Sequence, residues 1–313
     1  MKLSNVSMWL GAAMALAVPG FGTTASLAQP VHRIVAAEVL DLVRVNEQAK
    51  PAPPMRELSG LAWDNDEGRL IAVSDRGGVF SFTLDIEQGR IEAVVVSSAA
   101  AIQSPRRINA ESVWVRNGDN RKQGDSEILV ADERASNVAV VDLQGSIRSH
   151  ITLPQALRDR RRYEEKSKGV EAMAWHSRHG LVAAPQRPLQ GHAPSIHRIY
   201  ASEGTVWAFI ADRRGLSSVK AMESLGEGQL LVLEKVRTPA GDVSVLREIA
   251  LAACSEVSPC DPPALALHHP EIDSRHNFEG LACIARDLCL LVTDDGKPGS
   301  APGTLALVRL NYR

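Results

Sequence analysis

The chain is built from short apolar runs separated by polar turns, and the pattern is clearest in residues 57–77. Residues 58–63 and 70–74 are mostly apolar, and the segment between them reads Asp-Asn-Asp-Glu-Gly. Two apolar runs joined by such a turn predict a hairpin of antiparallel strands. If Trp63 faces Leu70 across the hairpin, Glu57 faces Arg76. A carboxylate and a guanidinium should therefore meet at its open end.

The same arrangement returns four more times, and each copy opens with a glutamate in front of an apolar run. Including the first copy, the opening residues are Glu57, Glu111, Glu171, Glu223 and Glu279, and they recur every 52 to 60 residues. Further strand-like segments follow the hairpins, such as residues 78–84 and 91–97. Four short strands repeated at this period are typical of propeller blades. The pattern predicts an all-β protein, a β-propeller of four-stranded blades with five visible repeats and five or six blades.

The two ends of the described pattern also have strand character, at residues 32–45 and 304–310. Pairing these segments in one sheet would close the ring and remove exposed strand edges. We therefore expect one propeller domain over residues 29–313. Two segments interrupt the repeats. Residues 155–168 are strongly charged and predict a surface helix or insertion, and residues 254–275 predict a long proline-rich loop.

The second strand of each repeat ends in polar residues, mostly acidic, which are followed by a base. The acids include Asp75, Asp132 and Asp294, and the bases include Arg76, Arg134, Arg187 and Lys235. In the third repeat, Gln186 stands where the others have an acid. The start of an innermost strand and the end of its antiparallel neighbour share one face of a propeller. We therefore expect the five opening glutamates to ring one channel mouth, with these acids and bases around them.

Converging carboxylates predict a site for a hard divalent cation, Ca²⁺ in particular. Such groups raise one another's pKa unless a cation neutralises them, and calcium takes about six to eight oxygen ligands. The predicted metal ligands are Glu57, Glu111, Glu171, Glu223, Glu279, Asp75, Asp132 and Asp294. Among them, the predicted catalytic residues are Glu111, Glu171 and Glu279. The predicted binders of an anionic ester are Arg76, Arg134, Arg187 and Lys235. The alternative is that each glutamate pairs with the base of its own blade as a structural device.

The composition is that of an exported globular protein. The chain has 313 residues, of which 44% are hydrophobic, and its net charge of −2 argues against nucleic-acid binding. Trp63, Trp114 and Trp175 occupy matching places in the repeats and should pack in blade cores. Residues 1–28 have the positive start, short apolar run and small residues typical of a cleaved signal peptide. No other apolar run approaches the length of a membrane span, so we expect a periplasmic or secreted monomer.

Four cysteines in an exported chain favour disulfide bonds, because that compartment is oxidising. They are Cys254, Cys260, Cys283 and Cys289. Three pairings are possible, and we favour Cys254 with Cys260 and Cys283 with Cys289, since the second pair lies across the fifth predicted hairpin. A zinc site is the alternative, but the chain has no Cys-x-x-Cys spacing. The histidines of the proline-rich loop are a further, weaker metal alternative.

Four repeats share short motifs in their first two strands. The motifs are Glu-Leu-Ser-Gly-Leu-Ala-Trp with Ala-Val-Ser-Asp-Arg-Gly, Glu-Ser-Val-Trp-Val with Val-Ala-Asp-Glu, Lys-Gly-Val-Glu-Ala-Met-Ala-Trp with Ala-Ala-Pro-Gln, and Asn-Phe-Glu-Gly-Leu-Ala with Val-Thr-Asp-Asp. These motifs resemble those of the phytase-like domain family, whose members are described as having esterase-like activity of phytase. The motifs occur in order between about residues 33 and 310. The resemblance implies a β-propeller and calcium-assisted hydrolysis of phosphate or other esters. The dense lysine and aspartate clusters of phytases are not evident here, so the resemblance does not extend to phytate as the substrate.

Two other functions fit the same repeats. One is a propeller that holds a ligand or partner at the same mouth without catalysis, and the other is a lactonase-type propeller. The motifs of other hydrolases are missing, including Gly-x-Ser-x-Gly and His-Glu-x-x-His. Ester hydrolysis by a metal-dependent site therefore remains the leading hypothesis.

Overall fold

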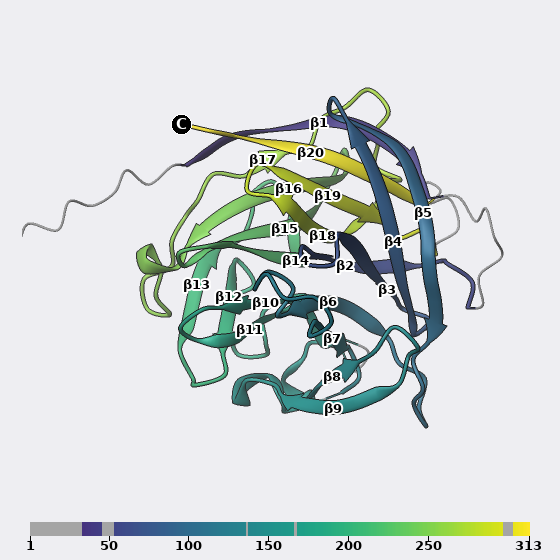
Figure 1. Cartoon of the computed structure of the whole chain (residues 1–313). Coiled ribbons are helices and arrows are strands. Elements are labelled where there is room, and N and C mark those ends of the chain that lie inside the picture. The colour runs from purple at the N-terminus through teal and green to yellow at the C-terminus, as the bar shows by residue number, and fades with distance from the viewer. Residues whose placement is uncertain (1–32, 46–52, 136, 166–167, 297–302) are drawn as a thin grey trace, which may run out of the picture. The chain divides into compact units, whose positions relative to one another are not determined.

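The computed structural model describes residues 33–45, 53–135, 137–165, 168–296 and 303–313. Over residues 33–313, the strands form five antiparallel sheets of four strands each (Figure 1). The innermost strands of neighbouring sheets contact one another around the ring, in the order β2, β6, β10, β14, β18 and back to β2. The predicted all-β propeller is therefore confirmed, with five blades. The predicted signal peptide lies outside the described residues.

The first two blades follow the chain from the innermost strand outward. Blade 1 contains β2 (Leu58–Asp64), β3 (Arg69–Ser74), β4 (Gly78–Glu87) and β5 (Arg90–Ala101). Blade 2 contains β6 (Ala110–Arg116), β7 (Glu127–Asp132), β8 (Asn137–Val141) and β9 (Ile147–Thr152). The third and fourth strands of both blades lie where the apolar runs predicted them.

The next two blades have the same order. Blade 3 contains β10 (Val170–His176), β11 (Gly180–Pro185), β12 (Ile196–Ala201) and β13 (Val206–Ile210). Blade 4 contains β14 (Leu216–Gly226), β15 (Gln229–Thr238), β16 (Gly241–Ala250) and the short β17 (Leu265–Ala266). The strands alternate with tight turns, and several of these turns use glycine at positive φ, such as Gly68 between β2 and β3.

Blade 5 joins the two ends of the described chain. It contains β18 (Phe278–Ala285), β19 (Leu288–Thr293) and β20 (Thr304–Tyr312), and its outer strand is β1 (Ile34–Arg44). β1 pairs antiparallel with β20, as the sequence predicted. Figure 1 shows the purple β1 lying beside the yellow β20. This pairing closes the ring and leaves β20 hydrogen-bonded on both sides, with β1 as the outer strand of the blade.

Large apolar side chains fill the space between blades. Phe80, Phe82, Phe209 and Phe278 are fully buried and belong to clusters shared by neighbouring sheets. The three tryptophans in matching places contact these clusters but are only partly buried, so they lie at the margin of the core. The sequence predicted that these tryptophans would pack inside the blade cores. Two of them, Trp63 and Trp114, instead line a pocket at one end of the channel.

The two interruptions of the repeats lie where the sequence predicted them. Residues 155–168 include two short 3₁₀ turns, η1 (Gln155–Leu157) and η2 (Arg160–Arg162). They are anchored by buried Leu157, whose carbonyl accepts a hydrogen bond from the Tyr163 hydroxyl at 2.9 Å. Within the described residues, no helix is long and apolar enough to cross a bilayer.

Two disulfides tie the second half of the chain. They join Cys254 to Cys260 and Cys283 to Cys289, which is the pairing that the sequence favoured. Cys283 and Cys289 face each other across the β18–β19 hairpin, while the other pair tethers the start of the proline-rich loop beyond β16. Two disulfides fit a protein of an oxidising extracellular or periplasmic compartment.

Candidate functional site

Each innermost strand contains a bulge close to its start. The ladder to the second strand skips one residue there, and the skipped residues are Ser59, Glu111, Glu171, Lys220 and Glu279. A bulge leaves its extra residue out of the ladder and re-aims the side chain. Because all five bulges have the same place in their blades, their side chains belong to the same end of the channel.

The bulges correct the predicted register in two blades. In blade 1, Trp63 does face Leu70, but the bulge at Ser59 shifts the ladder so that Leu58 faces Ser74. Glu57 therefore lies before the ladder, where its carboxylate pairs with Arg76 at 2.5 Å and its amide donates to Asp295. The predicted contact between Glu57 and Arg76 forms, but Glu57 is not the blade 1 equivalent of Glu111.

In blade 4, the residue equivalent to the other glutamates is Lys220, and the prediction that Glu223 joins the ring was wrong. Glu223 lies three residues further along β14, in the half of the strand that leads to the opposite mouth. The sequence contained the signal for this register. Val-Lys-Ala-Met at residues 219–222 matches Val-Glu-Ala-Met at 170–173, and Ser-Gly-Leu-Ala at 59–62 matches Glu-Gly-Leu-Ala at 279–282.

A second ring comes from one residue of each blade, which directly follows the ladder partner of the residue just before the bulge. Its members are Asp75, Glu133, Gln186, Lys235 and Asp294. In blade 2 the acid at this place is Glu133, which the sequence reasoning missed in favour of Asp132. Asp132 instead uses its Oδ1 to accept backbone amides of Asn109 and Arg134, at 3.1 and 3.0 Å, and so stabilises the turn.

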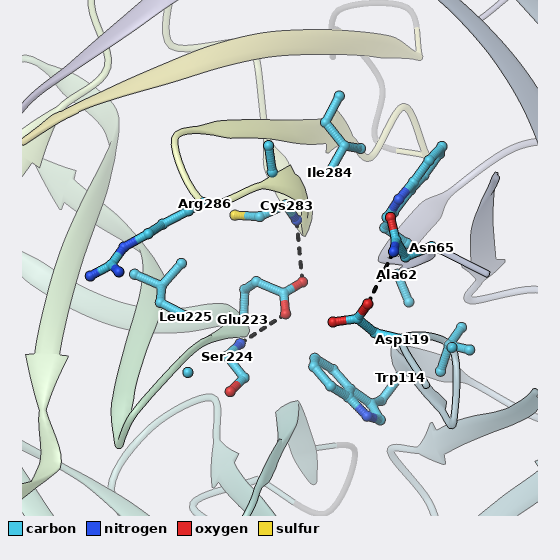
Figure 2. Close-up of a pocket in the computed structure, with 15 residues that line it drawn as sticks. Ala62, Asn65, Trp114, Asp119, Glu223, Ser224, Leu225, Cys283, Ile284 and Arg286 are labelled. Carbon is cyan, nitrogen blue, oxygen red and sulfur yellow. Dashed lines mark hydrogen bonds between the residues drawn. The ribbon is translucent and has the colours of Figure 1, made fainter. Parts of the chain in front are cut away.

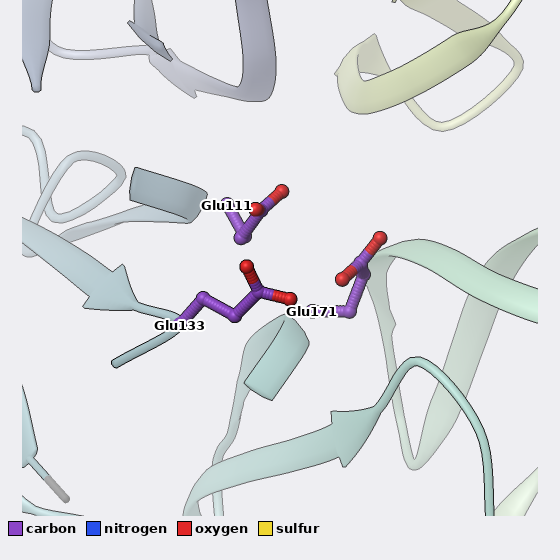
Figure 3. Close-up of side chains that lie close together, drawn as sticks. All are labelled: Glu111, Glu133 and Glu171. Atoms are coloured by element: carbon purple, nitrogen blue, oxygen red, sulfur yellow. The ribbon is translucent and has the colours of Figure 1, made fainter. Parts of the chain in front are cut away.

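Glu111, Glu133 and Glu171 form a buried trio at this acidic mouth (Figure 3). One carboxylate oxygen from each lies within 4.8 Å of the others, and the three residues are only 6%, 3% and 2% exposed. The Asn109 amide holds two of them in place, donating to Glu111 Oε1 at 2.8 Å and to Glu133 Oε2 at 2.5 Å. Figure 3 shows the three carboxylates converging from two neighbouring blades.

The third member of the trio has one oxygen without a hydrogen-bond partner. Glu171 Oε1 accepts from Gln186 Nε2 at 2.6 Å and from Lys220 Nζ at 2.5 Å, whereas Glu171 Oε2 is buried and receives no hydrogen bond from the described residues. A buried carboxylate oxygen in this state is costly unless a ligand satisfies it. The oxygen Glu171 Oε2 is therefore a first indication that the trio can bind a cation.

Blade 5 repeats the arrangement of blade 2 on the other side of the channel. The Asn277 amide donates to Glu279 Oε1 at 2.6 Å and to Asp294 Oδ2 at 3.2 Å, just as Asn109 bridges Glu111 and Glu133. Between the two halves, Lys220 Nζ lies 2.5 Å from Glu171 and 2.9 Å from Glu279. Lys220 therefore supplies a cation from within the chain, but only to the side of the mouth that faces blades 3 to 5.

The pKa shifts agree with an excess of carboxylates at this mouth. Burial, followed by repulsion from Glu171 and other acids, raises the pKa of Glu111 well above its usual value. Burial likewise raises the pKa of Asp75 to about 7, although the hydrogen bond from Ser59 opposes it. Burial also disfavours the charge of Lys220, yet Glu171 and Glu279 raise its pKa well above the usual value. A bound divalent cation would reverse the shifts of the acids.

The residues present therefore fit a hard cation, as their donor set consists of carboxylate oxygens. Calcium prefers such ligands and tolerates irregular geometry. Glu111, Glu133 and Glu171 bring their carboxylate oxygens close enough together to share one cation. The cation would also supply a partner for the buried oxygen of Glu171 that accepts no hydrogen bond. Asp75 and Glu279 interact electrostatically with the trio, and Asp294 interacts with Asp75. Glu57 pairs with Arg76 outside this set.

A basic pocket of about 230 Å³ adjoins the acidic mouth between blades 3 and 4. Its cationic side chains are those of Lys168, Arg187, Lys220, Lys235 and Arg237. Lys220 and Gln186 belong to both the pocket and the glutamate network. The pocket contains two of the four predicted anion-binding residues and adds three that were not predicted. An anion bound here would lie beside any cation that the trio holds.

The other two predicted anion-binding residues are not among the residues that line this pocket. Arg76 pairs with Glu57 and is half exposed, and Arg134 is an exposed residue of the turn after β7. The sequence prediction assumed that the base after the second strand has the same position in every blade, and so assigned all four bases to one site. Blades 3 and 4 differ from the rest because Gln186 and Lys235 stand where the other blades have acids, and both residues line the basic pocket.

Comparisons with known proteins agree with the fold and the repeated motifs. Residues 53–296 match the model of the family described as phytase-like, esterase-like activity of phytase. A search of curated proteins found no significant match.

A search of solved structures found matches at low sequence identity. The PQQ-bound aldose sugar dehydrogenase of Streptomyces coelicolor is 12% identical, with a TM-score of 0.47 over 88% of this chain and 98% of that one. The structure of U3-55K is 10% identical, with a TM-score of 0.39 over 82% of this chain and 79% of that one. The family match covers most of the chain, and this protein therefore belongs to the phytase-like family with esterase-like activity of phytase.

Proposed function

We propose that this protein is an exported, calcium-dependent hydrolase of phosphoesters or related esters, with its site at the acidic mouth of the channel. The observation that carries the proposal is the buried trio Glu111, Glu133 and Glu171, which has an oxygen without a partner and lies beside a basic pocket. Family membership supports ester hydrolysis as the reaction class. A site for a cation next to a site for an anion suits an anionic ester.

In this proposal the trio holds the cation and the basic pocket holds the substrate. The cation supplies Lewis acidity, which polarises a phosphoryl or carbonyl oxygen and makes a nearby water more acidic. Arg187 and Arg237 present guanidinium groups that suit paired hydrogen bonds to a phosphoryl or carboxyl group, and Lys168 and Lys235 add charge. We assign to Glu279, across the mouth, the role of accepting a proton from the attacking water.

The test is an activity screen of the mature protein with a titration of calcium. Aryl phosphates, carboxylic esters and lactones form the substrate panel, and each is assayed with chelator and with added Ca²⁺. We expect calcium-dependent turnover that Glu111→Gln and Glu133→Gln each reduce at least a hundredfold. Glu127→Gln makes the same chemical change at a surface ion pair and should leave turnover unchanged. Turnover that both trio variants retain would contradict the proposal.

One observation favours a binding propeller without catalysis as the second candidate. Lys220 already neutralises part of the carboxylate cluster through Glu171 and Glu279, so part of the mouth is stable without a metal. Calcium binding without turnover of any phosphate ester, carboxylic ester or lactone would support this candidate. Turnover confined to lactones would instead assign the lactonase-type activity.

A further inference from the structure

The opposite mouth of the channel contains a pocket that the proposed hydrolase site does not use. It has a volume of about 450 Å³ and is formed where β2, β6, β14 and β18 end and by the loop after β6. The acidic mouth lies at the other ends of the innermost strands. The two sites are therefore separated by the length of the channel. A volume of this size is within the range of small-molecule sites.

Glu223 is the buried polar group of this pocket (Figure 2). It is 6% exposed, and its oxygens accept backbone amides from Ser224 at 2.8 Å and from Cys283 at 3.3 Å. No lysine, arginine or histidine of the described residues forms an ion pair with it. Burial raises the pKa of Glu223 to about 8, and the two amide hydrogen bonds only partly oppose this effect. A buried carboxyl group that faces a cavity without a cationic partner would gain one from a cationic ligand, whose charge would favour the ionised form of the carboxyl group.

Much of the remaining wall is apolar and aromatic. Trp63, Trp114, Leu225 and Ile284 line the cavity, and the buried Trp63 Nε1 has no hydrogen-bond partner within the described chain. Indole rings attract ammonium groups through their faces and pack against hydrocarbon. These rings are the ones that the repeats place at matching positions, and the structure puts two of them at this mouth instead of in a blade core.

A second carboxylate strengthens the preference for positive charge. Asp119 accepts a hydrogen bond from Asn65 at 3.0 Å, and Figure 2 shows Asp119 and Glu223 extending into the pocket from opposite sides. Arg286 is the only basic residue on the wall within the described residues. Its guanidinium lies over the Tyr312 ring, 5.5 Å from the centroid, and is not paired with Glu223.

We propose that this pocket binds an organic ammonium ion with an apolar or aromatic body. The ammonium group lies between Glu223 and Asp119, and the body of the ligand packs against Trp63, Trp114 and the aliphatic wall. The pocket lacks the clustered carboxylates of the opposite mouth, and an inorganic cation would leave its apolar wall unused. The proposal is independent of whether the acidic mouth hydrolyses esters.

The test uses benzyltrimethylammonium chloride as the probe and benzyl alcohol as its uncharged counterpart. Binding is measured by calorimetry and by tryptophan fluorescence, on protein with chelator and with calcium. We expect saturable binding of the ammonium ion, at least tenfold tighter than binding of benzyl alcohol, and no competition from calcium. Absence of saturable binding, equal affinity for the two probes, or displacement by calcium would each overturn the proposal.

Variants locate the site. Glu223→Gln should weaken binding of the ammonium probe at least tenfold, and Asp119→Asn should weaken it about twofold to fivefold, because Asp119 is more exposed. Glu127→Gln changes a carboxylate that pairs with Arg116 and does not line the pocket, so it should leave the affinity unchanged. If Glu223→Gln does not fold, Asp119→Asn decides the question, since its side chain lies in an exposed loop. Unchanged affinity in a folded Glu223→Gln or, failing that, in Asp119→Asn contradicts the assignment.

Discussion

Lys220 shows how one residue changes the character of a repeated site. It stands where blades 2, 3 and 5 have a glutamate, and its ammonium group lies within 3 Å of two of those glutamates. The ring thus has two sides. On one side Lys220 neutralises Glu171 and Glu279, whereas on the other side no lysine of the described residues lies within 3 Å of Glu111 or Glu133. Because this position holds a lysine in place of a glutamate, it also adds a positive charge to the lining of the basic pocket. Lys220 therefore belongs to both the acidic mouth and the basic pocket.

Replacing Lys220 by methionine should destabilise the protein strongly. The change leaves Glu171 and Glu279 buried without their ammonium partner, and breaking a buried pair in this way costs about 3–5 kcal/mol. Urea unfolding in the presence of chelator measures the loss. If the acidic mouth binds calcium, added Ca²⁺ should recover part of it.

The matched control for this change is Lys122→Met, which removes an exposed lysine paired with Asp125. Exposed pairs contribute at most about 1 kcal/mol, so this variant should unfold nearly as the wild type does. A Lys220→Met protein as stable as the control would show that the glutamates do not depend on the lysine.

Glu223 should make the stability of the folded protein depend on pH. Its pKa is raised from 4.5 to about 8, so the folded state binds this proton more tightly than the unfolded state does. Proton binding by Glu223 therefore stabilises the folded state fully at pH values below its pKa in the unfolded chain. This stabilisation is lost as the pH rises through its pKa in the folded protein. The free energy of unfolding should therefore fall between about pH 4.5 and 8, and Glu223→Gln should flatten that part of the profile. An unchanged slope in the variant would assign the dependence to other groups.

At the scale of elements, the bulged innermost strands position the site. Each bulge directs one side chain to the acidic mouth, and small residues beside it allow the blades to approach closely. Gly60 follows the bulge at Ser59, and a Cβ at Gly60 would lie 2.9 Å from the backbone nitrogen of Val113 in the next blade. The geometry of the site is therefore inseparable from the packing of neighbouring innermost strands.

Gly169, just before β10, allows the closest of these approaches at the trio. A Cβ at this position would lie 2.0 Å from the carbonyl oxygen of Glu133, so the backbone of blade 2 or blade 3 would have to move. We expect Gly169→Ala to lower the free energy of unfolding by about 1–3 kcal/mol, as overpacking does. The same shift should weaken calcium binding, measured by calorimetry.

A suitable comparison is Gly303→Ala, because a Cβ there would approach no atom of the described residues more closely than 3.8 Å. This variant should keep both stability and calcium affinity near the wild-type values. If Gly169→Ala behaves the same way, the segment before β10 has more freedom than its contacts indicate.

For the whole molecule, the closed ring creates two mouths with different chemistry. One mouth gathers carboxylates and a basic pocket, and the other has aromatic walls around Glu223. The pairing of β1 with β20 holds the ring closed, so a ligand that binds several blades at one mouth stabilises the entire fold. Binding at either mouth should therefore appear in global unfolding.

Calcium should raise the thermal midpoint of the whole domain. A ligand that binds only the folded state at about 100 times its dissociation constant adds roughly 2.7 kcal/mol. We expect the midpoint to rise with Ca²⁺ and to fall with chelator, in a single transition followed by circular dichroism. Glu133→Gln should remove most of the calcium-dependent rise. A rise of equal size in this variant would mean that calcium binds away from the trio.

Much of this organisation follows from the sequence. The apolar runs and turns determine the hairpins, their recurrence determines a propeller, and the strand-like ends predict its closure. The buried acids Glu111, Glu171 and Glu279 were identified because each begins an apolar run. Glu133 was missed because Asp132 beside it fits the same pattern, and only the ladder shows which of two adjacent side chains leaves the turn and enters the mouth.

The sequence by itself determined the class of fold and the kinds of charged residue available to a site, since both depend on local patterns that repeat along the chain. The tertiary structure decided which residues meet. A bulge of one residue changes which side chain occupies the ring, as at Ser59 and Lys220, and a few positions along a strand separate the two mouths, as at Glu223. Such differences lie within one apolar run, where hydrophobic pattern cannot distinguish one register from the next.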